Sequence, residues 1–115
     1  MDKHEALQQY FGHATFRDGQ EEVVDAILQG RDVLGIMPTG AGKSVCYQLS
    51  AMLLSGLTIV ISPLISLMKD QVDSLLEIGI SAAYLNSSMD TGEYQVTMLQ
   101  ARQGIYRILY VAPER

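Results

Sequence analysis

The residues best suited to chemistry lie in the stretch VLGIMPTGAGKSVCYQ at positions 33–48. Gly40 and Gly42 let the backbone turn so that its N–H groups face inward, where they can bind phosphate oxygens. A helix predicted to begin near Lys43 adds the positive end of its dipole. Lys43 can reach the β- and γ-phosphates, and the Ser44 hydroxyl can bind Mg²⁺. The segment therefore predicts a nucleotide phosphate site in which Lys43 is catalytic.

The general phosphate-loop pattern, G-x-x-x-x-G-K-[ST], is broken at its first position, where this chain has Met37. The residues that contact phosphate come later in the loop. We assign the nucleotide site to Thr39, Gly40, Ala41, Gly42, Lys43 and Ser44, with Ser44 as the metal ligand. The alternative is a glycine-rich turn that only joins a strand to a helix. The apolar segment before the loop and the amphipathic segment after it favour nucleotide binding.

A site that hydrolyses nucleotide also requires a carboxylate near the end of a strand to hold magnesium. The segments predicted to be strands end in Met37-Pro38, Ser62-Pro63, Leu85-Asn86 and Ala112-Pro113. None of them ends in Asp or Glu. Glu114 is close to the last strand, but a proline precedes it and we do not assign it as the magnesium ligand. We expect the carboxylate that holds magnesium to lie outside residues 1–115.

Four short segments rich in Val, Ile, Leu and Tyr are predicted to be strands: 33–37, 57–61, 82–85 and 107–111. Three of them lack polar alternation, which is typical of a sheet covered on both faces. The gaps between them are long enough for helices that join parallel strands. The predicted fold class is α/β with a largely parallel sheet and helical crossovers.

Helices are predicted where apolar residues recur at helical spacing, after Ser44 and again from Leu64 onward. Ser62 is expected to cap the second of these helices, with Pro63 in the first helical position.

Two further helices are expected to begin at capping boxes, Asp18-x-x-Glu21 and Asp90-x-x-Glu93. Glycines in the left-handed conformation are expected to follow the ends of all four helices. These glycines are Gly30, Gly56, Gly79 and Gly104.

The formal net charge is −5, and the eight basic residues are scattered along the chain. Charge alone therefore gives no argument for a nucleic-acid partner. Cys46 is the only cysteine, which excludes an internal disulfide, and we expect it to be a small buried packing residue. The start of the chain is polar, and no apolar stretch approaches the ~20 residues of a membrane span. We expect a soluble cytoplasmic protein with no membrane partner.

Several segments resemble one family. MPTGAGKS at 37–44 resembles the phosphate loop of superfamily 2 helicases, in which alanine or methionine replaces the first glycine. FGHATFRDGQ at 11–20 resembles the segment that precedes this loop in RecQ-family DNA helicases. SPLISLMKDQ at 62–71 and YVAPER at 110–115 resemble the next two motifs of that family, in the same order and spacing. The resemblance implies a P-loop NTPase fold, part of the first RecA-like motor domain.

In this family the segment at 11–20 holds the adenine base. Gln20 would read the edge of the base with an amide that both donates and accepts hydrogen bonds. Arg17 and the ring of His13 would bracket the base, although many members have tyrosine at the His13 position. Asp18 stands where proline is common. Taken alone, Arg17 could be a surface charge, His13 a loop residue and Gln20 a residue of the first helical turn.

The resemblance also implies that 62–71 and 113–115 line the groove for single-stranded DNA, partly through backbone amides and hydroxyls. This mode of binding requires few cations and is compatible with an acidic chain. The DNA-binding residues implied are Ser62, Pro63, Ser66, Lys69, Pro113 and Arg115. The alternative for 62–71 is a capped helix whose role is to complete the core.

We expect an N-terminal helical segment with the adenine motif at 1–30 and an incomplete first RecA-like domain at 31–115. The resemblance implies ATP and Mg²⁺ as cofactors, and places the magnesium carboxylate and a second motor domain beyond Arg115. DNA, as single strands and duplex junctions, and the remainder of the helicase chain are the expected partners. The chain alone is expected to be marginally stable, to self-associate and to bind nucleotide weakly without hydrolysis.

The predicted function is therefore part of an ATP-dependent 3′-to-5′ DNA helicase. One alternative is a non-catalytic module that binds nucleotide or DNA. Another is a small-molecule kinase with the same phosphate loop. The segments 16–20 and 62–71 argue against the kinase, which has no reason to carry them.

Overall fold

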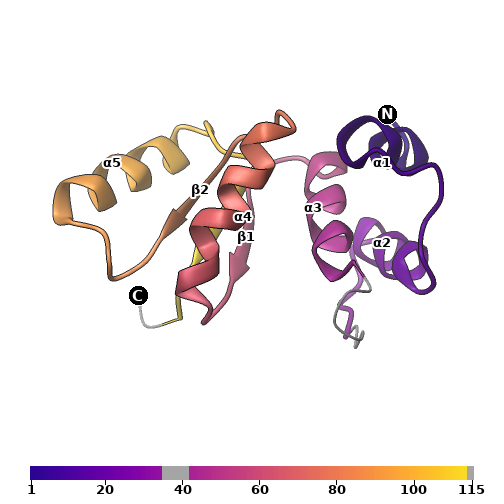
Figure 1. The fold of residues 1–115 in the computed structure, drawn as a ribbon, viewed down its shortest axis with the longest axis horizontal. Coiled ribbons are helices and arrows are strands. Elements are labelled where there is room, and N and C mark those ends of the chain that lie inside the picture. Colours follow the sequence, from indigo (N-terminus) through magenta and orange to yellow (C-terminus); the bar gives the residue numbers. More distant parts are fainter. Residues whose placement is uncertain (35–41, 114–115) are drawn as a thin grey trace. The chain divides into compact units, whose positions relative to one another are not determined.

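The computed structural model describes residues 1–34 and 42–113. Figure 1 shows the helices and strands in chain order. They are α1 (Lys3–Phe11), α2 (Gln20–Leu28), α3 (Lys43–Leu53), β1 (Thr58–Ile61), α4 (Ile65–Glu77), β2 (Ala82–Leu85), α5 (Thr91–Arg102) and β3 (Ile108–Val111). The chain forms two compact units, Met1–Ser55 and Gly56–Arg115. Across residues 1–34 and 42–113, each helix is too short or too polar to cross a bilayer.

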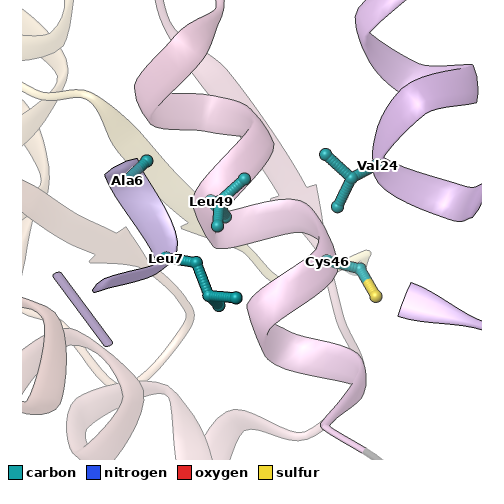
Figure 2. Close-up of a cluster of buried hydrophobic side chains, with 5 residues drawn as sticks. All are labelled: Ala6, Leu7, Val24, Cys46 and Leu49. Atoms are coloured by element: carbon teal, nitrogen blue, oxygen red, sulfur yellow. The ribbon is translucent and has the colours of Figure 1, made fainter. Parts of the chain in front are cut away.

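The first unit consists of three helices around a small apolar core. Ala6 and Leu7 from α1, Val24 from α2, and Cys46 and Leu49 from α3 point into this core (Figure 2). Cys46 and Leu49 lie on one face of α3 because they are three residues apart. Cys46 is 5% exposed, and burial raises the pKa of its thiol. The predicted packing role of Cys46 is confirmed.

The second unit is a parallel sheet with strand order β1-β3-β2. Ile61 pairs with Val111 on one side of β3, and Leu85 pairs with Val111 on the other. The chain crosses the sheet from β1 to β2 through α4 and returns to the middle through α5. Since parallel crossovers are right-handed, these opposite directions place the two helices on opposite faces. Both helices contact β2, which runs between them in Figure 1.

The positions of the strands and the fold class are largely as predicted. The strand predicted at 82–85 has the same bounds as β2, and those predicted at 57–61 and 107–111 begin one residue before β1 and β3. The strand predicted at 33–37 is not supported where the structure describes it, because Val33 and Leu34 belong to no strand. Residues 35–37 lie outside the described residues.

The predicted start of α4 is wrong. The helix begins at Ile65, with Leu64 rather than Ser62 as its N-cap. The N–H of Ser62 donates to the carbonyl of Val111 at 3.0 Å, so Ser62 still belongs to the sheet ladder. Its hydroxyl instead accepts the N–H of Leu64 at 3.1 Å and closes the turn that leads to the helix.

The predicted capping boxes differ in outcome. Asp18 does not cap α2, whose N-cap is Gly19, because a tight turn in which the Gln20 N–H donates to the Arg17 carbonyl (3.1 Å) precedes the helix. Asp90 does cap α5, since its carboxylate accepts the N–H of Glu93 at 2.8 Å. The four glycines expected after helices are all left-handed, with φ between 76° and 86°.

Candidate nucleotide site

The start of α3 has the geometry of an anion site. Gly42 is its N-cap, with φ at 79°, and no side chain of the described residues caps the helix. Lys43 is exposed and Ser44 is half-buried in the first turn. A helix N-terminus without a side-chain cap presents N–H groups and a positive dipole end to an anion. The other residues assigned to this site, Thr39, Gly40 and Ala41, lie outside the described residues.

Gln20 links the segment before α2 to the start of α3. Its side chain is buried, at 4% exposure. Its Oε1 accepts the backbone N–H of Arg17 at 2.8 Å. Its Nε2 donates to the carbonyl of Gly42 at 3.1 Å. The residue assigned to the base and the loop assigned to the phosphates therefore meet within the first unit.

Gly42 is packed against the Gln20 side chain. A Cβ added at Gly42 would lie 2.3 Å from Gln20 Nε2. Its φ of 79° is also one that residues with a Cβ rarely adopt. The left-handed φ favours glycine, and an alanine here would also displace the end of the Gln20 side chain.

The other two residues assigned to the base are in the connection between α1 and α2. His13 and Arg17 are both exposed. The backbone N–H of His13 donates to the carbonyl of Leu7 at 3.3 Å, which ties this connection to the end of α1. Both side chains are thus accessible to a ligand.

Two hollows flank α2. One, of about 440 Å³, lies against α3 and falls in the size range of small-molecule pockets. Its lining is Val23, Ile27, Arg31, Asp32, Val33, Lys43, Cys46 and Tyr47. The other, of about 320 Å³, is at the start of α2 and is lined by Phe16, Arg17, Asp18, Gly19, Glu21, Glu22 and Asp25. Lys43 therefore borders a cavity with mainly apolar walls, and Arg17 borders one with acidic walls.

The described residues contain no group of three or more His, Cys, Asp or Glu side chains able to hold a metal ion. Ser44 remains the residue whose oxygen could bind magnesium beside the phosphates. One protein hydroxyl is compatible with Mg²⁺, which keeps several waters and takes few protein ligands at nucleotide sites.

In the second unit, the residues assigned to DNA follow the carboxyl ends of β1 and β3. These strands are neighbours, so Ser62 and Pro63 lie at the same sheet edge as Pro113. Ser66 and Lys69 are exposed on the first turns of α4. Arg115 lies outside the described residues.

Lys69 already has a protein partner. Its ammonium donates to Asp73 Oδ2 at 2.7 Å, one turn further along α4. This carboxylate raises the pKa of Lys69. Because both side chains are exposed, water screens the pair and Lys69 can exchange this partner for a phosphate.

Sequence reasoning did not assign a role to Asn86, at the carboxyl end of β2. Asn86 is 2% exposed, and its Oδ1 accepts the backbone N–H of Ser88 at 2.9 Å and also the Ser88 hydroxyl. It fixes the turn that leads to α5. A polar residue directly after an apolar strand was the available signal. Sequence reasoning also missed Lys3, whose contacts with α2 are described below.

The chain is similar to known helicases along almost its whole length. A family model described as DEAD/DEAH box helicase matches residues 17–115. The chain is 56% identical over 111 residues to the ATP-dependent DNA helicase RecQ of Pasteurella multocida (strain Pm70), covering 96% of this chain and 18% of the relative. It is 50% identical over 110 residues to the ATP-dependent DNA helicase RecQ of Bacillus subtilis (strain 168), covering 95% and 19%. These identities confirm the predicted resemblance to the RecQ family.

A solved structure confirms the fold class. The crystal structure of a hypothetical ATP-dependent RNA helicase from Sulfolobus tokodaii superposes with a TM-score of 0.71 at 22% identity. The match covers 98% of this chain and 34% of that one. The chain spans about a fifth of the length of the two relatives named above.

Proposed function

Because the chain belongs to the DEAD/DEAH box helicase family, we propose that it forms part of the first motor domain of an ATP-dependent DNA helicase of the RecQ type. The whole cytoplasmic helicase couples ATP hydrolysis to 3′-to-5′ unwinding, with DNA and the remainder of the helicase chain as partners. The observation that carries the proposal is the hydrogen bond of 3.1 Å from Gln20 Nε2 to the Gly42 carbonyl. It joins a base-reading residue to a phosphate loop.

The phosphate end of the nucleotide is assigned to the start of α3. Backbone N–H groups of the first turn bind phosphate oxygens. Lys43, exposed beside them, neutralises charge on the β- and γ-phosphates and stabilises the charge that develops during transfer. The Ser44 hydroxyl holds Mg²⁺, which when bound supplies further neutralisation of the phosphate oxygens. Thr39, Gly40 and Ala41 complete the cradle in this proposal.

The base end is assigned to the connection between α1 and α2 and to the start of α2. Gln20 discriminates adenine when its buried amide exchanges its bonds to Arg17 and Gly42 for the base edge, to which it offers a donor and an acceptor. The planar guanidinium of Arg17 stacks on the base, with the His13 ring on its other side. Because Gln20 contacts Gly42 in this structure, the base site lies beside the phosphate site.

The DNA-binding surface is assigned to the sheet edge of the second unit. Ser62 and Ser66 offer hydroxyls, and Lys69 offers an ammonium, to backbone phosphates. Pro63, Pro113 and Arg115 complete this surface in the proposal. Such contacts position a strand without reading its sequence, in accordance with a motor that moves along DNA.

The first test is ATP binding by this chain and its Lys43→Ala variant, measured by isothermal titration. Removal of a charge-assisted contact should weaken binding by about tenfold or more. Arg102→Ala, which removes a cation from the end of α5, is the control and should bind as the unchanged chain does. Equal affinity of Lys43→Ala and the unchanged chain would show that the loop is not a phosphate site.

The second test is hydrolysis with the remainder of the helicase chain present. DNA should stimulate ATP hydrolysis, and Lys43→Ala should abolish it. Nucleotide binding without any hydrolysis would instead identify a non-catalytic binding module. Hydrolysis that responds to a small-molecule acceptor and not to DNA would identify a kinase.

A further inference from the structure

Lys3, in the first turn of α1, bridges two carboxylates of α2. Its Nζ lies 2.7 and 2.9 Å from the two oxygens of Asp25, and 2.8 Å from Glu21 Oε2. Its side chain is 24% exposed. Asp25 and Glu21 raise the pKa of Lys3, so its ammonium stays charged at neutral pH. This is a three-membered ion cluster between two helices.

The cluster has a clear effect on α2. Glu21 and Asp25 are four residues apart on the same helix, where two like charges destabilise it. Lys3 lies between them and replaces this repulsion with attraction. The N-terminal part of α2, which begins at Gln20, is thereby linked to the first turn of α1.

His4 extends the cluster to the base-side segment. Its Nε2 lies 3.3 Å from Glu21 Oε2. Its ring makes an edge contact with Phe16, with centroids 5.5 Å apart. Phe16 directly precedes Arg17, whose backbone N–H donates to Gln20 Oε1 at 2.8 Å. A continuous series of contacts thus runs from the first turn of α1 to the residues assigned to the base.

We propose that Lys3 is a positioning residue for nucleotide binding, which holds the start of α2 so that Arg17 and Gln20 face the base. The inference rests on the function proposed above, since it concerns the same base site. A positioning role of Lys3 differs from a purely structural role in one respect. A positioning residue of the base site affects ligands that have a base and leaves binding of a phosphate chain alone unchanged.

The test compares two ligands, ATP and inorganic triphosphate, by isothermal titration of the unchanged chain, Lys3→Ala and Lys3→Arg. Lys3→Ala should weaken ATP binding about three- to fivefold, as expected for loss of the two partly exposed ion pairs with Glu21 and Asp25. The affinity of Lys3→Ala for triphosphate should equal that of the unchanged chain within experimental error. Lys3→Arg keeps the charge and both carboxylate contacts, and should restore ATP binding.

Two further variants keep the test valid if Lys3→Ala folds poorly. Asp25→Asn removes one charge of the cluster from the α2 side and should show the same preferential loss of ATP. Asp73→Asn removes an ion pair of similar length, 2.7 Å to Lys69, in the second unit and should change neither affinity. Circular dichroism checks that each variant keeps its helices.

The outcomes separate this inference from the proposed function. If Lys3→Ala and Asp25→Asn weaken ATP and triphosphate equally, or weaken neither, Lys3 does not position the base site, while the proposed function stands. If the unchanged chain binds neither ligand, the proposed function fails and this inference fails with it.

Discussion

At the scale of single residues, Gly42 is under two constraints that can be separated. Its φ of 79° favours glycine at any such position. Its contact with Gln20 adds a second constraint at this position in particular, because a Cβ would lie 2.3 Å from Gln20 Nε2 and would displace the end of that side chain. Gly12 has only the first constraint, with φ at 71° and nothing within 4 Å of an added Cβ.

Gly42→Ala should therefore cost more than Gly12→Ala. The left-handed conformation costs an alanine about 1–2 kcal/mol in both variants, and Gly42→Ala adds the clash with Gln20. We expect a larger fall in the free energy of unfolding and a loss of ATP binding of about tenfold or more. Urea denaturation and isothermal titration measure the two effects. Combining Gly42→Ala with Gln20→Ala should recover the stability that Gly42→Ala loses beyond the loss in Gly12→Ala. Equal stability of Gly42→Ala and Gly12→Ala would contradict the clash.

Gln20→Ala should reduce the preference for ATP over GTP. A site that hydrogen-bonds one base edge loses its discrimination when the bonding group is removed. We expect the ratio of the two dissociation constants to approach unity, as measured by titration with each nucleotide. Gln29→Ala, at the exposed C-cap of the same helix, is the control. An unchanged ratio in Gln20→Ala would show that this residue does not read the base.

At the scale of elements, α1 depends on its N-cap. The Asp2 carboxylate accepts the N–H of Glu5 at 2.8 Å, and this bond lowers the pKa of Asp2 below its ordinary value of 3.8. A carboxyl group with a lowered folded pKa stabilises the fold fully above its unfolded pKa. This stabilisation is lost as pH falls through the folded pKa.

The helicity of α1 should therefore fall as the pH is lowered below 3.8, the ordinary pKa of aspartate. Asp2→Asn keeps a good N-cap that does not titrate, so the variant should lose less helicity over the same range. Circular dichroism at 222 nm gives the helicity of both proteins as a function of pH. Because the other carboxylates titrate in both, the difference between the two curves isolates the contribution of Asp2. Identical curves would mean that the Asp2 carboxylate does not stabilise α1.

At the scale of the whole molecule, one strand of the sheet has exposed apolar residues. Among the described residues, β1 pairs on one side only, with β3. Ile59 and Ile61 on this strand are 57% and 71% exposed. An edge strand with such residues is a template for pairing with another chain. This placement is the structural basis for the expected self-association.

Ile61→Lys should shift the chain toward the monomer, because a charged side chain on an edge strand opposes pairing. Analytical ultracentrifugation over a range of micromolar concentrations measures the shift. Val96→Lys places the same charge at a residue of α5 that is 55% exposed, and should leave association as it is in the unchanged chain. A chain that is monomeric and melts in one sharp transition would contradict both the association and the marginal stability.

Local features of the fold follow from the amino-acid sequence alone, because they depend on neighbouring residues. Strand β2 has its predicted bounds, Asp90 caps α5, and left-handed glycines follow the helices as expected. These features follow from side-chain shape, local hydrogen bonding and the conformational freedom of glycine, all of which act within a few residues. The motifs for phosphate, base and DNA were recognisable for the same reason, since each is a short continuous segment.

How distant segments meet depends on the tertiary structure. Gln20 donates to Gly42 and Lys3 to Asp25, each pair 22 residues apart. Because β3 lies between β1 and β2, Val111 lies beside Ser62. The Ser62 N–H donates to the Val111 carbonyl and keeps Ser62 in the sheet, so α4 begins only at Ile65. Such contacts depend on the packing of whole helices and strands, in which many weak apolar interactions set the geometry. No short segment of sequence contains that information.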